Sequence, residues 1–325
     1  MIEILSDSAL ATVQDLGRFG CLHWGVGTSG AMDPLALQAG NLLLGNDPGA
    51  AAIEVQVFPF EVRFEAPCGF AVTGADCDAR LDGRALPPWW SGIAAAGQRL
   101  RLGLPRDGAW RGCRAYLCVS GGVDVAPVLG SRSTQLRGAF GGLEGRTLRR
   151  GDRLGHGAPS GGAGFGVVPP GLALPLARDG VPAIRVIPAA EYPRYTPGSL
   201  AAFWGEPWRI TPQSDRYGYR LAGPTLAPLA PIELRSHGIV PGVIQVPHGG
   251  QPIVQMRDAQ PSGGYPKIGT IIEADLWRFG QAPIGSQVRF MVANWDEALA
   301  ARDAAEAWLG EVGRLVALHR AQVAA

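Results

Sequence analysis

The stretch TVQDLGRFGCLHWGVGTSGAMD, residues 12–33, predicts the turns and the helix start in the first part of this chain. Five of its residues are glycine, which reaches backbone conformations closed to other residues and therefore favours tight turns. The stretch ends at Asp33, and Pro34 follows. This pair is typical of a helix start, with Asp33 as the N-cap and Pro34 at the first helical position. We therefore expect a series of turns and then a helix within DPLALQAGNLLLG, residues 33–45.

Outside this stretch, short apolar runs recur between glycine, proline and aspartate residues. Runs bounded in this way are typical of a turn-rich β protein. The predicted strands include residues 60–64, 69–72, 115–119, 183–187, 253–256 and 287–292. A second helix is expected over residues 297–319, with Asp296 as its cap. The sequence thus predicts a mainly β fold with few helices and a C-terminal helix.

The length of 325 residues predicts two domains, because domains typically run about 100–200 residues. Residues 159–180 hold many glycines and prolines, little charge and no clear period, so they are the predicted linker. The first domain is expected over residues 1–158, with the first helix as an insertion, and the second over residues 181–325. Glycine motifs recur in the same order in both parts but at different spacings, so an internal duplication stays open.

Composition narrows the class of protein. Twenty-nine basic and 28 acidic side chains give a net charge of +1, and no basic stripe is present, which argues against a nucleic-acid partner. The sequence opens on no signal-peptide pattern and contains no run of about 18 apolar residues, so no membrane contact is expected. Five cysteines without a CxxC pair indicate reduced thiols in a cytoplasmic protein.

The glycine-rich segment GVGTSGAMDP has two interpretations. Its backbone N–H groups could approach an anion just before a helix N-terminus, or the segment could be a tight turn that Asp33 caps. Asp15 and Arg18 flank Gly17, so they could form a structural bridge. Alternatively, Arg18 binds a carboxylate or phosphate in a two-pronged manner while Asp15 orients it.

Two further segments carry candidate site residues. In SGGVDVAPVLGSRST, Arg132 lies between Ser131 and Ser133, an arrangement that suits either an oxyanion clamp or a structural loop. The segment GVIQVPHGGQPIVQMRDAQPSGGYPKIG places six polar side chains near paired glycines, which favours a pocket. These six are Gln245, Asp258, Gln260, Ser262, Tyr265 and Lys267.

Lys267 is the centre of that predicted pocket. Gly263 and Gly264 permit a sharp turn, Pro266 stiffens the chain, and Lys267 then lies beside Asp258. A lysine there could neutralise charge that develops on a carbonyl or phosphoryl oxygen. The alternative is a solvated loop lysine. The histidines are scattered and form no HExxH motif, so no metal site is predicted, and no serine-histidine triad is indicated.

Several motifs together resemble one known family. They are TVQDLGRFG, SGAMDPLAL, AGNLLLGN, VTGAD, SGGVDVAPVLGSRST, GRTLRRGD, SDRYGYRLAGP, IQVPHGGQPIV and DAQPSGGYPKIGT. The chain resembles the KipA-like proteins, also called allophanate hydrolase subunit 2 or the biotin-dependent carboxyltransferase family, from about residue 11 to residue 290. The resemblance implies two cyclophilin-like β-barrel domains, one on each side of the linker.

The same resemblance implies a function. Members of one branch act with a KipI-like B subunit, together with a LamB/YcsF-like A subunit, in the ATP-dependent and Mg²⁺-dependent opening of 5-oxoproline to glutamate. Members of another branch are biotin-dependent carboxyltransferases for a urea-like amide. A third hypothesis is a non-catalytic regulator that binds a KipI-like kinase inhibitor. We favour the first, in which this chain is the C subunit of the enzyme, inactive alone.

Under this hypothesis, backbone amides and polar side chains form a shallow anion-accepting site for a lactam or amide carbonyl. The residues expected in catalysis are Lys267, Asp258, Tyr265 and Asp33, and those expected to bind the substrate or an anion are Arg18, Ser29, Gly30, Arg132, Ser133, Gln245, Gly263 and Gly264.

Overall fold

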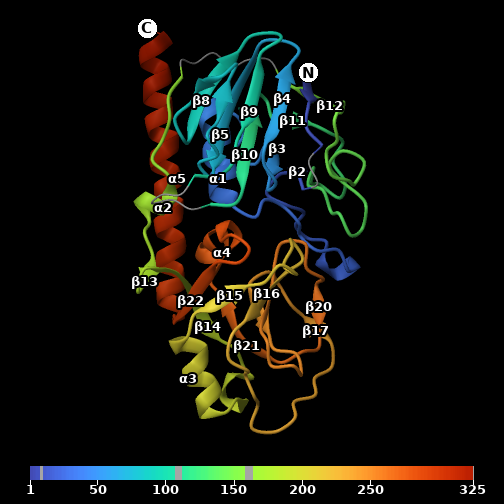
Figure 1. The fold of residues 1–325 in the computed structure, drawn as a ribbon, viewed down its shortest axis with the longest axis vertical. Helices are drawn as coiled ribbons and strands as arrows, with labels where there is room; N and C mark the ends of the chain where they lie inside the picture. The colour runs from blue at the N-terminus through green and yellow to red at the C-terminus, as the bar shows by residue number, and fades with distance from the viewer. Residues whose placement is uncertain (8–9, 107–111, 158–163, 325) are drawn as a thin grey trace. The chain divides into compact units, whose positions relative to one another are not determined.

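A computed structural model describes residues 1–7, 10–106, 112–157 and 164–324 (Figure 1). The chain divides into two compact units. The first comprises Met1–Arg18, Ser29–Leu174 and Glu306–Ala325, and the second comprises Phe19–Thr28 and Pro175–Ala305. The fold is mainly β with few helices and a long C-terminal helix, as the sequence predicts. The division differs from the predicted boundaries, because residues 19–28 group with the second unit and residues 306–325 with the first.

Two antiparallel sheets build the first unit. The larger has the strand order β11 (Val123–Asp124), β12 (Arg153–His156), β1 (Ile2–Ile4), β4 (Phe60–Phe64), β9 (Arg99–Leu102), β6 (Arg80–Leu81) and β7 (Arg84–Ala85). The smaller has the order β2 (Thr12–Gln14), β3 (Ala52–Val55), β10 (Ala115–Val119), β5 (Cys68–Gly74) and β8 (Trp90–Ala94). Strand β4 alternates buried and half-buried residues, as expected of a sheet with one covered face.

Strands β5 and β10 are buried along their whole length because both faces of the smaller sheet are covered. On one face, Phe70 and Leu117 pack in a core shared with the larger sheet. On the other face, Ala71 and Tyr116 pack against helix α1 (Pro34–Leu44) and the last turns of helix α5 (Trp295–Ala324). This alternation follows from the two-residue period of a strand. The helix within residues 33–45 is confirmed, with Asp33 as its N-cap.

The second unit contains a closed barrel. Its strands run in the order β14 (Val181–Pro188), β21 (Lys267–Ile271), β18 (Val243–Gln245), β19 (Ile253–Gln255), β16 (Gly218–Ala222), β15 (Trp208–Ile210) and β22 (Gln287–Val292). Strand β22 then pairs in parallel with β14, which closes the ring. The short strand β13 (Ala177–Arg178) extends β14, and β17 (His237–Gly238) pairs with β20 (Ser262–Gly263) beside the barrel.

The remaining helices are short apart from α5. They are η1 (Leu22–Trp24), α2 (Pro170–Ala173), η2 (Tyr192–Arg194), α3 (Pro197–Gly205) and α4 (Glu273–Gln281). The predicted cap of α5 is wrong: the Asn294 side chain accepts from the Glu297 N–H at 2.9 Å, and the Glu297 carboxylate accepts from the Asn294 N–H at 2.8 Å. This reciprocal pair satisfies two N-terminal donors, so the helix begins before Asp296.

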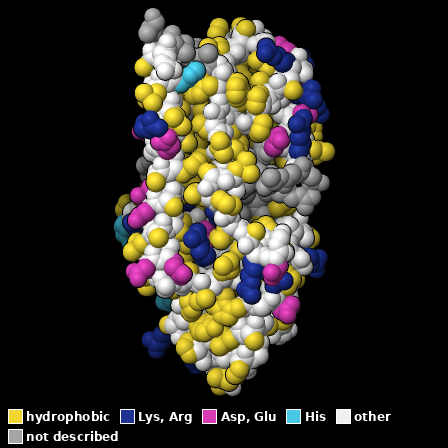
Figure 2. Space-filling model, turned by 90° about the vertical axis from the view of Figure 1, so that its left-hand side faces the viewer, with side chains coloured by type: hydrophobic (Ala, Val, Ile, Leu, Met, Phe, Trp, Pro, Cys, Tyr) yellow, Lys and Arg dark blue, Asp and Glu magenta, His cyan; other side chains and the backbone are white. Residues whose placement is uncertain are grey.

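All five cysteines are free. Burial raises the pKa of the Cys68 thiol to about 11 and that of Cys77 to about 12, so both stay protonated at neutral pH. In the described part of the chain, no helix combines the length and apolar character needed to cross a membrane. Apolar side chains gather on the side of the molecule that carries α5 (Figure 2), and α5 itself has Leu299, Leu315 and Leu318 about half exposed.

Candidate functional site

The predicted site residues fall into two polar clusters, one in each unit. In the first unit, the Asp15 carboxylate binds the loop that carries Arg132. Its Oδ1 accepts from the Ser131 hydroxyl at 2.7 Å and also from the Ser133 hydroxyl, and its Oδ2 accepts from the Arg132 N–H at 2.6 Å. Arg18 donates to the Ser133 carbonyl at 2.6 Å and is almost fully buried. Asp15 therefore joins the two predicted motifs into one structure.

Two residues before the first helix have left-handed backbones. Gly30 has φ of +91°, and a Cβ there would come within 2.8 Å of the Leu16 and Gly17 backbones. Glycine is therefore required where the stretch folds back on itself. Ser29 has φ of +51° and is fully buried. Close packing thus accounts for Gly30, whereas Gly20 and Gly25 have open space around them and fit their positions through φ values of +79° and +78°.

Asp33 lies in a buried polar network that includes residues the sequence did not indicate. Its Oδ1 accepts from the Ala36 N–H at 2.9 Å, and its own N–H donates to the Tyr116 hydroxyl at 2.7 Å. That hydroxyl donates to Glu54 Oε2 at 2.7 Å, and Arg114 lies 3.8 Å from the same carboxylate. All four side chains of this network are essentially unexposed.

The network holds Tyr116 in its protonated form. Burial is the main reason that the pKa of Tyr116 is well above its ordinary value, and the Glu54 and Asp33 charges add to the effect. Glu54 is the acid inside the otherwise apolar strand β3, AIEV. A glutamate in a fully buried strand is the signal that could have pointed to it, since buried carboxylates need partners.

The second cluster surrounds Lys267 at the start of β21. Its Nζ lies 3.4 Å from Glu191 Oε2, and its backbone N–H donates to the same oxygen at 3.1 Å. Nζ also contacts Nε2 of His237, on the short strand β17. The Lys267 side chain is 17% exposed, so the ammonium is partly withdrawn from water yet still reaches the surface. Neither Glu191 nor His237 was expected from the sequence.

Gln245 and Tyr265 lie in the same cluster. Gln245 is the cross-strand partner of Lys267, and its amide Nε2 donates to the Tyr265 carbonyl at 3.4 Å. Gln255 donates to Gln245 Oε1 at 2.9 Å, which fixes the orientation of that amide. The Tyr265 ring is 47% exposed and meets the His248 ring edge-on. The structure thus brings Lys267, Gln245 and Tyr265 together.

The paired glycines before Tyr265 pack closely. A Cβ on Gly263 would lie 2.7 Å from Gln245 Nε2, and one on Gly264 would lie 3.1 Å from the Leu234 carbonyl oxygen. A side chain at Gly263 would therefore displace the Gln245 amide. These glycines shape the cluster through their lack of a side chain.

Asp258 has another partner than the sequence predicted. Its carboxylate accepts two hydrogen bonds from the Arg216 guanidinium, each at 3.0 Å, and both side chains are nearly buried. The acid beside Lys267 is Glu191. Asp258 and Arg216 lie just beyond the paired ends of the neighbouring strands β16 and β19, where the Asp258 N–H also donates to the Arg216 carbonyl at 2.9 Å.

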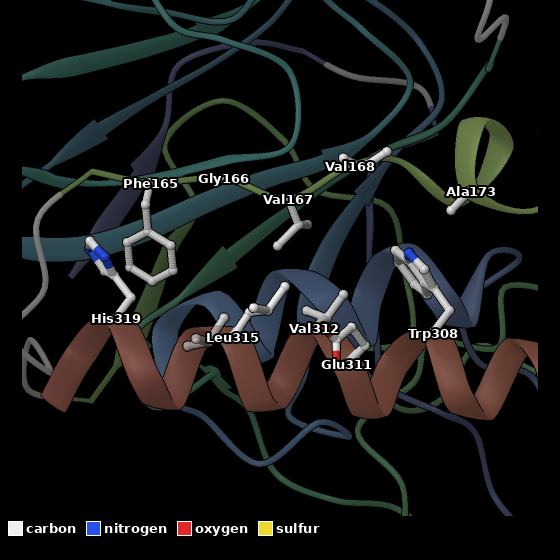
Figure 3. A pocket seen from close by; sticks show the side chains of 11 residues that line it. Phe165, Gly166, Val167, Val168, Ala173, Trp308, Glu311, Val312, Leu315 and His319 are labelled. Atoms are coloured by element: carbon white, nitrogen blue, oxygen red, sulfur yellow. The ribbon is translucent and has the colours of Figure 1, made fainter. Parts of the chain in front are cut away.

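A cavity of about 550 Å³ lies apart from the predicted site residues, in the first unit (Figure 3). It lies between the segment around Phe165–Val168 and helix α5, and its lining is apolar except for Glu311 and His319. Glu311 is paired with Arg314. The described lining of the cavity does not gather several polar side chains at one point, so the Lys267 cluster is the better candidate for a catalytic site. Among the described residues, no group of three or more metal-ligating side chains is present.

Comparison with known proteins identifies the class. The chain belongs to the family of the carboxyltransferase domain, subdomain A and B, which matches residues 24–292. It is 44% identical over 313 residues to the 5-oxoprolinase C subunit of Escherichia coli K12, covering 93% of this chain and 94% of the relative. It is 41% identical over 320 residues to the 5-oxoprolinase C subunit of Haemophilus influenzae, covering 97% and 99%. The resemblance seen in the motifs is confirmed, as is the predicted class of enzyme subunit.

Solved structures agree with this family assignment. The Kluyveromyces lactis urea carboxylase structure has a TM-score of 0.86 and 26% identity, covering 96% of this chain and 29% of that chain. The putative urea carboxylase of Emericella nidulans is 30% identical over 321 residues, which are 96% of this chain and 26% of the relative. In these larger proteins, a region like this whole chain is one part among several.

Proposed function

We propose that this chain is the C subunit of an ATP-dependent 5-oxoprolinase, which opens 5-oxo-L-proline to L-glutamate. Two curated relatives that match almost end to end are named as the C subunit of 5-oxoprolinase, and that name marks them as parts of multi-subunit enzymes. The partners in this proposal are a KipI-like B subunit, together with a LamB/YcsF-like A subunit. The observation that carries the proposal is the Lys267 ammonium, held between Glu191 and His237 at the barrel.

This geometry suits attack on a lactam carbonyl. During attack by water, the carbonyl oxygen gains negative charge, and a fixed cation stabilises that charge most strongly where water is partly excluded. Lys267 is such a cation. The Glu191 carboxylate holds it by contacting both the Lys267 ammonium and the Lys267 backbone N–H. The half-exposed Tyr265 adds a phenol on the same segment. In this proposal Lys267 and Tyr265 meet the substrate, and Gln245 orients the loop between them.

The described residues of this chain do not fit ATP and Mg²⁺. Protein atoms lie close around Gly30 and Gly263, so a nucleotide triphosphate, which is much larger than a carbonyl oxyanion, has no room beside either glycine. No set of three or more His, Cys, Asp or Glu side chains in the described ranges is placed to hold a metal ion. We therefore assign the nucleotide and its metal to a partner subunit.

Other roles from the sequence stand as proposals. Arg18, Ser29, Gly30, Arg132, Ser133 and Asp33 would form a second anion-accepting region, and Asp258 would act through its pair with Arg216. The two domains would each be a cyclophilin-like barrel, over residues 1–158 and 181–325. The closed barrel of the second unit and the single core between the two sheets of the first support this proposal. Free cysteines suit a cytoplasmic complex.

A second candidate function is a biotin-dependent carboxyltransferase that acts on a urea-like amide. The likeness to urea carboxylase at a TM-score of 0.86 favours it. Both reactions place negative charge on an amide-type oxygen, so Lys267 would serve in either. A regulator that binds a KipI-like kinase inhibitor would need no such cation. The two enzyme functions therefore differ in the substrate that drives turnover, and the regulator would show no turnover.

The test is reconstitution of the complex from this chain and its KipI-like and LamB/YcsF-like partners. We expect glutamate formation and ATP turnover that depend on 5-oxoproline. Lys267→Ala should lower turnover at least about a hundredfold with the complex still assembled, because loss of a fixed donor typically costs about 3–4 kcal/mol in the barrier. Arg209→Ala is the matched control, since Arg209 is an exposed cation on the same barrel.

Two results would contradict this function. Wild-type turnover by the Lys267→Ala complex would show that this cation is not at the reaction centre. Turnover driven by urea, bicarbonate and a biotinylated carrier, with none from 5-oxoproline, would favour the carboxyltransferase.

A further inference from the structure

Lys267 is the only lysine in a sequence that contains 28 arginines. Throughout the rest of the chain, arginine supplies every basic side chain other than histidine. Arginine stays protonated under all ordinary conditions, whereas a lysine amine can give up and regain its proton. The retention of one lysine, at the centre of the proposed site, points to a need for a group that exchanges a proton and not only for positive charge.

The neighbour of Lys267 can exchange that proton. His237 Nδ1 lies 2.9 Å from the Arg235 carbonyl oxygen, which can only accept a hydrogen bond. Nδ1 therefore carries a hydrogen, and in that tautomer Nε2 has a lone pair facing the Lys267 Nζ with which it is in contact. The Lys267 amine can donate a hydrogen bond to that lone pair. His237 itself is partly exposed to solvent.

We propose that Lys267 and His237 act as a proton-sharing pair, in which Lys267 is the acid and base of the reaction and His237 stores its proton. This inference rests on the proposed function. When the proton is on His237 Nε2, Lys267 is a neutral amine that takes a proton from the attacking water as the new C–O bond forms. When the C–N bond of the lactam breaks, the Lys267 ammonium gives a proton to the departing nitrogen.

The proton count of this cycle balances. One proton passes from water to Lys267, one passes from Lys267 to the lactam nitrogen, and the pair returns to its starting state with its shared proton. No oxidant, reductant or outside acid is needed. Glu191 keeps the amine in place throughout, because its Oε2 also accepts the Lys267 backbone N–H at 3.1 Å. Strand pairing of His237 with Gly263 fixes the backbone from which the ring extends, beside the barrel.

Three variants of the reconstituted complex test the pair. Lys267→Arg keeps the charge but removes the exchangeable amine, so it should be about as slow as Lys267→Ala. His237→Gln keeps a hydrogen-bond acceptor for Lys267 but cannot store a proton, and we expect a loss of at least about a hundredfold, in the range of general acid–base catalysis. Added imidazole should restore at least a tenth of the wild-type rate to His237→Gln. His156→Gln is the matched control, since His156 makes the same Nδ1 contact with a backbone carbonyl, at 2.7 Å, far from Lys267 in the sequence.

A measurement without turnover separates this inference from the proposed function. In ¹⁵N spectra of the wild-type chain, the His237 ring should show a protonated Nδ1 and a lone-pair Nε2 whose signal moves in Lys267→Ala. The pair is overturned if that signal does not respond to the lysine substitution. It is also overturned if Lys267→Arg or His237→Gln turns over at near the wild-type rate, or if imidazole fails to raise the rate of His237→Gln. A wild-type complex that makes no glutamate, with the expected spectra, would instead count against the proposed function.

Discussion

At the residue scale, Asp33 is a helix cap that also lies in a buried polar network. It caps α1 through the Ala36 N–H and lies beside the Tyr116 and Glu54 pair. Asn and Asp cap helices about equally well, whereas loss of a cap costs about 1 kcal/mol. We expect Asp33→Asn to leave the melting temperature almost unchanged, and Asp33→Ala to lower the free energy of unfolding by about 1 kcal/mol, both measured by urea denaturation.

Turnover of the same variants in the complex decides whether Asp33 has a catalytic role. If Asp33→Asn unfolds normally but loses most of the activity, the carboxylate acts on the reaction. Equal activity and stability in Asp33→Asn and the wild type would leave only the capping role.

The residue scale also shows where sequence reasoning succeeds. Tyr265 and Lys267 could be predicted to lie together because they follow the same glycine turn. Gln245 could be added because it lies in the same polar segment, whose two predicted strands bring it beside Lys267. Glu191 and His237 could not, since they lie 76 and 30 positions from Lys267 and reach it only when the barrel forms. Asp258 was placed beside Lys267 on proximity in sequence, yet it pairs with Arg216, 42 positions away.

At the scale of elements, the predicted strands are confirmed most accurately where the sequence pattern of apolar residues is strong. Strands β4, β10 and β22 begin and end at the predicted residues, because each alternates or is wholly apolar between turn residues. Helices α3 and α4 were missed. Helix α3 has the same kind of start as α1, a Thr196 cap followed by Pro197, but it is only nine residues long and was overlooked. Helix α4 follows Ile272 without a side-chain cap, so its start carries a weak local signal.

The last turns of α5 should stabilise the first unit by packing. Val312 and Val316 are 4% and 6% exposed and join the core beneath α1. Replacing both with alanine removes four methyl or methylene groups from that core, so we expect the free energy of unfolding to fall by about 3 kcal/mol. Urea denaturation followed by tryptophan fluorescence would measure this change, since Trp308 and Trp89 lie in the same region.

Leu318→Ala is the comparison for that pair of substitutions. Leu318 lies on the same helix but is 50% exposed, so its replacement should change stability by less than about 1 kcal/mol. If Leu318→Ala and the double variant lowered the free energy of unfolding equally, burial of Val312 and Val316 in the core would not be the source of the stabilisation by α5.

At the scale of the whole molecule, the sequence predicts two domains but not their membership. A division by linkers assumes that each domain is one continuous stretch. Residues 19–28 and 306–325 break this assumption, because their contacts are with parts of the chain distant in sequence. The apolar runs and turn residues predicted the mainly β fold, whereas the resemblance to a family supplied the predicted barrels and the function.

The whole molecule should be inactive without its partners. In the proposed enzyme another subunit binds the nucleotide and its metal, so hydrolysis driven by ATP draws on that subunit. We expect the purified chain to show no 5-oxoproline-dependent ATP turnover and the three-protein complex to show it, under identical conditions. Glutamate release by the isolated chain at a rate close to that of the complex would disprove this.

The division of the chain has a consequence for its biosynthesis. A ribosome makes a chain in the direction of its sequence, and domains generally fold in the order in which they emerge. Most of the first unit emerges before most of the second unit, whereas the α5 residues that complete its core emerge after the second unit. The second unit is therefore fully synthesised before the first can finish folding. Until the α5 residues have emerged, the apolar surface on which Val312 and Val316 pack stays exposed, and a chaperone could bind it.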